Sequence, residues 1–162
     1  VLTAEPEPTL TLALYRQLAT SHVQHADVYE VRLLLETWAA SHADHVGGDW
    51  SDADRTLALM DDAGLTVDEF LQLDAEFHIA LSRSAGNPLI STLMDALRTS
   101  IADHTLTRAR SLPDWERTAE RLRAEHRAIF LSFREGDAAR ATALLRAHIR
   151  GYYEETAAAL ES

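Results

Sequence analysis

The sequence predicts an all-α protein, an antiparallel bundle of six to seven helices. Glycine and proline number only 6 and 4, and most of them separate long stretches in which apolar residues recur every three or four positions. That spacing is typical of amphipathic helices joined by short connections. No stretch alternates apolar and polar residues for long enough to indicate a strand.

The first part of the chain predicts a linker and two helices. Residues 1–8 carry two prolines and two glutamates, so we expect a linker there and the helical domain over residues 9–162, beginning with a helix at residues 9–21. Asp27 is the expected N-cap of the second helix, which Gly47-Gly48 would end. The apolar residues of this helix predict a buried face made of Val28, Val31, Leu34, Leu35, Trp38 and Ala39.

Capping signals delimit the next three helices. A short helix is expected over residues 51–64, with a terminal glycine. Thr66, with Glu69 three residues later, forms a capping-box pattern that predicts the start of a helix. Asn87 followed by Pro88 is an N-cap followed by proline at the first helical position, which predicts the start of another.

The C-terminal part predicts a helical hairpin. Pro113 starts one helix, Gly136-Asp137 forms a tight turn, and a last helix follows over residues 138–160. The apolar residues of both helices recur at helical spacing, so each is expected to turn one face toward the core.

Four polar residues fall on the expected inner faces. Asp74 and His78 are separated by four residues, so they share a face of one helix about one turn apart. His126 and His148 lie 10 residues before and 11 residues after the Gly136-Asp137 turn. Each helical residue advances about 1.5 Å, which places both imidazoles about 15 Å from the turn, at one level.

One carboxylate and three imidazoles that converge would suit a divalent transition metal, above all Zn, with Ni, Mn or Fe as alternatives. Taken singly, Asp74 is equally explained as a core carboxylate held by an arginine or by a helix of slightly different phase, and each histidine is better explained as a satisfied core residue. Taken together, with matched heights, they favour a metal. Such a centre would keep a net positive charge, and an open coordination position would receive a small carboxylate or hydroxy acid.

The remaining composition excludes several classes of protein. The formal net charge is −11, so the chain itself should be repelled by nucleic acid. The absence of cysteine excludes a disulfide framework and a thiolate site, and it fits a cytoplasmic protein. There is no HExxH, ExxH, GxSxG or glycine-rich phosphate loop, and no apolar run suited to a membrane span.

The sequence resembles the FCD domain, the C-terminal effector-binding domain of the FadR branch of GntR-type transcription regulators. The resemblance covers nearly the whole chain from residue 9 onward. Its motifs are DVYEVR at residues 27–32 with Leu35-Glu36, DAEFH at 74–78, SAGNPL at 84–89, EHRAI at 125–129, Gly136-Asp137 and His148.

This resemblance implies a homodimeric regulator in which Asp74, His78, His126 and His148 bind the metal and a small organic acid binds beside it. It also implies an N-terminal winged-helix DNA-binding domain, which would precede the linker at residues 1–8. We therefore expect this chain to be the sensing domain of a longer protein, and operator DNA to be contacted only through that other domain.

Four further residues are candidates for effector binding. Arg32 could anchor a carboxylate, although an ion pair with Glu36, four residues later, explains it equally well. Asn87 could face the pocket or serve only as an N-cap, and Arg98 could do so or be solvated. His104 falls on the inner face of its helix and could line the pocket, or it could lie in solvent.

Two other functions compete with the sensor. A metal-dependent helical-bundle enzyme would use an open coordination position to activate water or oxygen. The expected inner faces supply no second carboxylate for such chemistry, since Glu76 and Glu125 should point elsewhere, so we expect no enzyme. A closed structural or metal-sensing site with four protein ligands is the other alternative.

Overall fold

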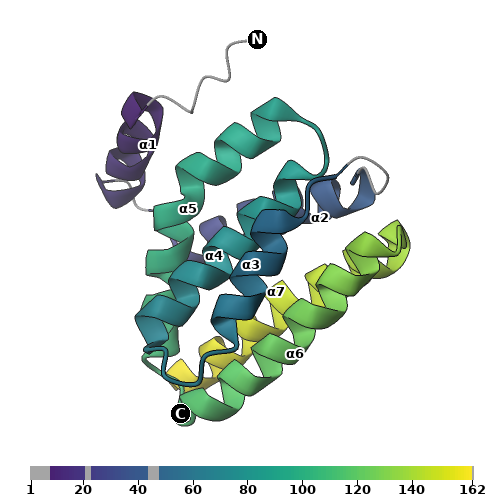
Figure 1. Ribbon diagram of the computed structural model, residues 1–162. Helices are drawn as coiled ribbons and strands as arrows, with labels where there is room; N and C mark the ends of the chain where they lie inside the picture. Colours follow the sequence, from purple (N-terminus) through teal and green to yellow (C-terminus); the bar gives the residue numbers. More distant parts are fainter. Residues whose placement is uncertain (1–7, 21–22, 44–47, 162) are drawn as a thin grey trace.

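The computed structural model describes residues 8–20, 23–43 and 48–161, and within these ranges it contains seven helices and no strand. The helices are α1 Pro8–Thr20, α2 His25–Ser41, α3 Ser51–Met60, α4 Val67–Arg83, α5 Pro88–Ala109, α6 Trp115–Arg134 and α7 Ala138–Glu161. The all-α bundle predicted from the sequence is therefore confirmed (Figure 1).

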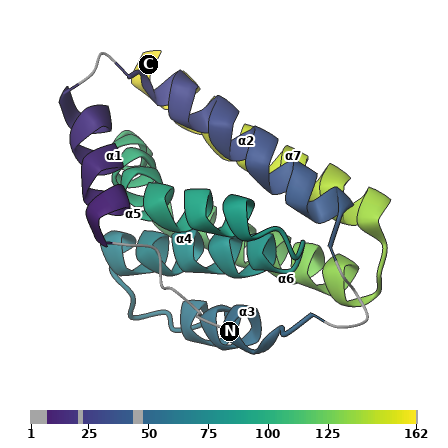
Figure 2. The same ribbon diagram turned by 90° about the horizontal axis from the view of Figure 1, so that it is seen from above.

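The bundle is organised around α4. This helix packs against α2, α3 and α5, while α7 packs against α2 and α6. Figure 2 shows α2 and α7 lying alongside each other, and α1 against the flank of α5. Helices α2, α4, α6 and α7 thus bring residues from four distant parts of the sequence to one interior.

Large apolar side chains fill the space around that interior. One cluster joins α3, α4, α6 and α7 and includes Phe77, Ile129 and Leu145, and a second joins α2, α4 and α5 around Ile79 and Met94. At about 25 cal/mol per Å² of buried apolar surface, residues of this size dominate the favourable free energy of folding. They also exclude water from the polar groups that lie between them.

The capping signals position α4 and α5 as predicted. The backbone N–H of Glu69 donates to the Thr66 hydroxyl at 3.2 Å, and the backbone N–H of Thr66 donates to the Glu69 carboxylate at 2.8 Å. The Asn87 side chain accepts from the backbone N–H of Leu89 at 3.0 Å at the start of α5. Both caps satisfy amides that a helix leaves without partners.

The hairpin turn is also confirmed. Gly136 has φ 75°, a left-handed conformation that a Cβ disfavours, between the end of α6 and the start of α7. The turn makes the two helices antiparallel neighbours. His126 and His148 consequently lie at the same level of the bundle, as their distances from the turn predicted.

Several predicted boundaries were wrong. The linker expected at residues 1–8 lies outside the described residues except for Pro8, which begins α1. Helix α2 begins at His25 with Gln24 as N-cap, and the Asp27 carboxylate accepts from the Gln24 backbone N–H at 2.7 Å. Asp27 therefore caps from inside the first turn rather than from the N-cap position. The helix ends at Ser41.

Two glycine terminators also differ from expectation. Gly47 lies outside the described residues, and Gly48 is far beyond the end of α2. Helix α3 ends at Met60, before the predicted Gly64. A glycine can follow a helix by several residues when a short turn separates them, which sequence patterns do not resolve.

The buried face of α2 was predicted correctly at Val28, Leu35 and Ala39 and wrongly at three other positions. Val31, Leu34 and Trp38 are exposed to 43%, 67% and 36%, whereas Arg32 and Glu36 are buried to 7% and 1% exposure. Hydrophobic periodicity assigns charged residues to the surface, but here they find charged partners inside the bundle. The face of α2 that carries Arg32 and Glu36 therefore turns inward.

None of the described helices combines the length and the hydropathy needed to cross a bilayer.

Candidate metal centre

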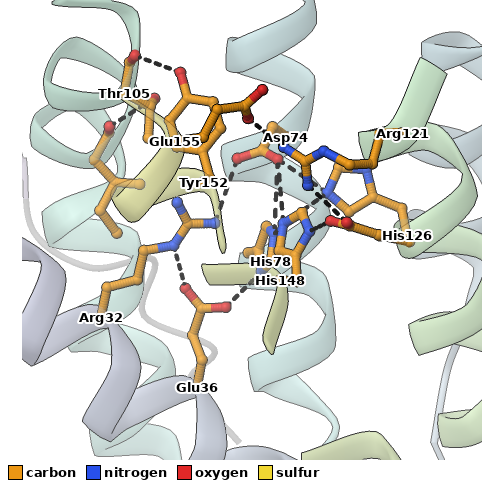
Figure 3. A network of polar contacts seen from close by, with 12 residues as sticks. Arg32, Glu36, Asp74, His78, Thr105, Arg121, His126, His148, Tyr152 and Glu155 are labelled. Atoms are coloured by element: carbon orange, nitrogen blue, oxygen red, sulfur yellow. Dashed lines mark hydrogen bonds and ion pairs between the residues drawn. The ribbon is translucent and has the colours of Figure 1, made fainter. Parts of the chain in front are cut away.

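Asp74, His78, His126 and His148 meet in the interior of the bundle. All four are buried, and one ligand atom from each lies within 4.8 Å of the corresponding atoms of the others. Two come from α4, one from α6 and one from α7. Figure 3 shows the three imidazoles and the carboxylate turned toward one another. The convergence that the sequence pattern predicted is therefore present.

The donor atoms are spaced as metal ligands are. Asp74 Oδ1 lies 3.0, 3.7 and 4.0 Å from the Nε2 atoms of His126, His78 and His148. The Nε2 atom of His148 lies 3.2 Å from those of His78 and His126. Ligands bound at about 2.0–2.2 Å from a tetrahedral metal are about 3.4 Å apart. The donor set thus fits a transition-metal ion in both chemistry and spacing.

Two glutamates orient His78 and His148 by contacting the ring nitrogen that faces away from the cluster. Glu36 Oε2 lies 2.5 Å from Nδ1 of His78, and Glu125 Oε2 lies 2.7 Å from Nδ1 of His148. A carboxylate can only accept, so each Nδ1 carries the proton and donates it. In the neutral imidazoles, both Nε2 atoms are then unprotonated and point their lone pairs into the cluster. This carboxylate–histidine arrangement is the one that supports metal-bound histidines.

His126 is held differently. Its Nδ1 has no hydrogen-bond partner among the described residues, although the atom is buried. The ring packs against Phe77, with 4.9 Å between ring centroids, and near Phe70 at 6.4 Å. Aromatic packing therefore fixes the orientation of this imidazole where no carboxylate does.

The charges in the cluster shift its pKa values in opposite directions. Burial alone would raise the pKa of Asp74, but His78, His126 and Arg32 hold it well below its usual value. Burial and the neighbouring His148 lower the pKa of His126 to about 3, and burial also lowers that of His148. The pKa of His78 is raised in spite of burial, because Glu36 and Asp74 stabilise its charged form.

Arg32 bridges two acidic residues beside the cluster. Its Nε lies 2.7 Å from Glu36 and its Nη2 lies 3.3 Å from Asp74. The ion pair with Glu36 that the spacing suggested is confirmed. Figure 3 shows the guanidinium between the two carboxylates. Arg32 is thus paired with two carboxylates of the protein.

Two adjoining pockets lie on the side of the cluster that faces α5. The inner pocket borders Asp74 and His148, and the outer one, which opens to solvent, borders His104 and Arg108. The residues that line both are Arg32, Thr105, Ile149 and Tyr152. The Tyr152 hydroxyl donates to the Thr105 carbonyl at 2.8 Å and links α7 to α5 there.

The four proposed effector residues are placed at different distances from these pockets. Arg32 lines both pockets, and His104 lines the outer one. Asn87 caps α5 and borders neither pocket, and Arg98 is exposed and pairs with Glu76 at 3.6 Å. The second pair of candidates is therefore not brought to the cluster.

Sequence reasoning missed several residues of the site. Glu125 was expected to point away and instead contacts His148, while Arg121 pairs with Glu125 at 2.6 Å on its outer side. Glu36 was considered only as a partner of Arg32, although its position four residues later places it on the same face. No sequence pattern marked Arg108 as a pocket residue, because nothing in its helix predicts which distant helix it faces.

Comparison with known proteins agrees with this architecture. The sequence model of the FCD domain matches residues 27–151, which is most of the chain and includes all four residues of the cluster. A search of curated proteins gives no match. The chain belongs to the FCD domain family, the C-terminal effector-binding domains of GntR/FadR-type transcription regulators.

Proposed function

We propose that this chain senses a small organic acid by binding it beside a divalent transition metal held by Asp74, His78, His126 and His148. Zinc is the preferred ion, because three imidazoles and one carboxylate match its usual ligands, with nickel, manganese or iron as alternatives. Membership of the FCD family supports a role in transcription regulation rather than catalysis.

The metal assignment rests on two histidine Nε2 atoms that approach each other although neither carries a proton in the neutral imidazoles. His78 and His148 each direct a protonated Nδ1 to a glutamate, so their Nε2 lone pairs face each other at 3.2 Å. Buried lone pairs at that distance repel unless a proton or a cation lies between them. A divalent cation would satisfy both nitrogens together with His126 and Asp74.

The adjoining pockets support an acidic ligand. A divalent ion with one carboxylate and three neutral imidazoles carries a net positive charge, and Arg32 lies on the pocket wall beside it. A carboxylate or hydroxy acid in the inner pocket would approach the metal from the side of His148 and Asp74. Surrounding apolar residues such as Leu71 and Leu122 would strengthen that attraction by excluding water.

Ligand binding would be transmitted through the helices that meet at the site. The pockets are walled by α2, α4, α5, α6 and α7, so a ligand that prefers one packing of these helices shifts the domain toward it. In this proposal the domain acts in a homodimer, and a winged-helix domain that precedes residue 9 contacts the operator.

Elemental analysis tests the metal first. Protein purified without chelator or a metal-affinity column should contain about one transition-metal ion per chain. His126→Ala and His148→Ala should lose the ion, and His42→Ala, which alters an exposed histidine at the end of α2, should keep it. Circular dichroism verifies that each variant is folded. Stoichiometric metal in a folded His126→Ala or His148→Ala variant would contradict the site.

A thermal-shift screen of small carboxylates then tests the effector. The melting temperature should rise with the correct acid in the metal-loaded protein and stay unchanged after treatment with EDTA. An equal rise in melting temperature in both samples would show that acid binding does not depend on the metal. Metal binding without any response to an acid would favour the closed structural site.

A further inference from the structure

We propose that Arg108 binds a second anionic group of the effector, so that this chain recognises a dicarboxylate rather than a monocarboxylate. This inference rests on the proposed function of the same site and specifies the class of acid. It assigns a role to a buried cation that the metal cluster does not use.

Arg108 is buried without a negative partner. The residue is only 8% exposed, its Nε donates to the Thr156 hydroxyl at 2.7 Å, and its Nη2 donates to the Tyr153 carbonyl at 2.8 Å. The guanidinium carbon lies 4.3 Å from the centre of the Tyr153 ring. All of these partners are neutral, and within the described part of the chain Arg108 forms no ion pair.

Arg32, the other buried arginine on the pocket wall, is paired with acidic residues. Arg32 is equally buried but lies between the carboxylates of Glu36 and Asp74. Charged groups withdrawn from water are normally paired, since an unpaired buried charge is costly. Of the two arginines on the pocket wall, Arg108 is therefore the one whose charge is left for a ligand.

The guanidinium stands at the end of the pocket that lies away from the metal cluster. Arg108 borders the outer pocket, whereas Asp74 and His148 border the inner one, and Thr105 borders both. Thr105 and Arg108 are three residues apart on α5, so they share a face about 4.5 Å apart along the helix axis. A short chain could contact the junction with one carboxylate and Arg108 with another.

The charge on the pocket walls favours a dianion. Among the described residues, the charged side chains that border the two pockets are Arg32, Arg108 and Asp74. Cations outnumber anions there even without a metal, and a divalent ion would add two positive charges. A monocarboxylate at the metal would leave Arg108 uncompensated, whereas a second carboxylate could pair with its guanidinium by charge-assisted hydrogen bonds.

The neutral contacts of Arg108 also hold it ready to bind. Thr156 and Tyr153 belong to α7, so a guanidinium from α5 is fixed by hydrogen bonds across the helix interface and by the aromatic ring beneath it. A cation held in position loses little conformational freedom when an anion arrives.

Matched acids test the inference in zinc-loaded protein by isothermal titration calorimetry. Malate and 2-hydroxybutyrate have the same number of carbons and the same hydroxy acid group, and only malate carries a second carboxylate. Malonate with propionate and glutarate with valerate extend the comparison to other lengths. At least one dicarboxylate should bind about tenfold or more tightly than its monocarboxylate partner.

Variants then assign the preference to Arg108. Arg108→Met should reduce the affinity for that dicarboxylate to the level of the monocarboxylate and leave the monocarboxylate unchanged. Arg108→Lys should retain part of the preference. Thr156→Val removes a hydrogen-bond partner but not the charge, so it should keep the preference and controls for altered packing.

The outcomes separate this inference from the proposed function. Monocarboxylates that bind in a zinc-dependent manner, with no dicarboxylate bound more tightly, would overturn the role of Arg108 and leave the sensor intact. Equal losses for both acids in Arg108→Met would show a structural role and would also overturn it. Failure of every acid to bind zinc-loaded protein would contradict the proposed function and this inference with it.

Discussion

The carboxylate of Glu36 on α2 lies 2.5 Å from Nδ1 of His78 on α4. This contact joins two helices far apart in the sequence and fixes which nitrogen of His78 carries the proton. The same glutamate receives the Arg32 guanidinium at 2.7 Å. One buried carboxylate therefore both orients a candidate ligand and neutralises a neighbouring cation.

Replacement of Glu36 should weaken metal binding without removing a ligand. Glu36→Gln can no longer hold His78 by a charged acceptor, and loss of such a supporting carboxylate typically lowers metal affinity about 10–100-fold. Competition with a chromophoric chelator measures the change. Glu76→Gln, in a largely exposed pair with Arg98 on the outer side of α4, is the matched control. Equal affinity in wild type and Glu36→Gln would contradict this role.

Removal of Arg32 should destabilise the fold. Arg32→Ala leaves Glu36 and Asp74 buried without their shared counter-ion, and breaking such a pair costs about 3–5 kcal/mol in free energy of unfolding. Urea denaturation of the metal-free protein measures this. Arg55→Ala breaks an exposed pair with Asp52 and should cost less than about 1 kcal/mol. Similar losses in the two variants would refute the argument from burial.

Arg32→Ala should also weaken binding of an organic acid while the metal stays bound. Arg32 borders both pockets but none of its atoms belongs to the donor set. Calorimetry with a carboxylate identified in the thermal-shift screen, together with elemental analysis, separates the two effects. Unchanged acid affinity would show that Arg32 acts only through its ion pairs with Glu36 and Asp74.

Acid should destabilise the metal-free domain through His126. Its pKa falls from an ordinary 6.5 to about 3 on folding, so between these values the unfolded chain binds a proton that the folded chain does not. The contribution of His126 to the free energy of unfolding is therefore fully present above pH 6.5. It is lost as the pH falls, by up to about 2 kcal/mol at pH 5. His148 acts in the same direction and His78 in the opposite one.

Urea denaturation at pH 7.5 and pH 5 measures this dependence. His126→Phe removes the titrating group and keeps an aromatic ring beside Phe77, so the loss of stability on acidification should be smaller than in wild type. An unchanged difference between the two pH values would show that other groups account for it.

Shortening Leu122 should cost stability and enlarge the inner pocket. Leu122 is 1% exposed and borders that pocket. Leu122→Ala should therefore lower the free energy of unfolding by about 2–5 kcal/mol. Leu131→Ala, at a 49% exposed position of the same helix, should change it by less than about 0.5 kcal/mol. Denaturant titration of both variants distinguishes a packing effect from a change in helix propensity.

Local signals in the sequence determined much of this molecule. The Thr66–Glu69 capping box, the Asn87-Pro88 start and the Gly136-Asp137 turn depend on residues close together in the chain, and each was predicted and is present. The turn also set the common level of His126 and His148, because helix rise converts sequence distance into height.

The tertiary structure determined the contacts between residues on different helices, which local sequence signals do not specify. Hydrophobic periodicity placed Val31, Leu34 and Trp38 inside, but Arg32 and Glu36 turn inward because Asp74 and His78, on another helix, satisfy their charges. The contact of Glu125 with His148 and the lack of a carboxylate beside Arg108 likewise depend on how α5, α6 and α7 face one another. A sequence alone specifies which charges are present, and only the packed helices specify which charges find a partner.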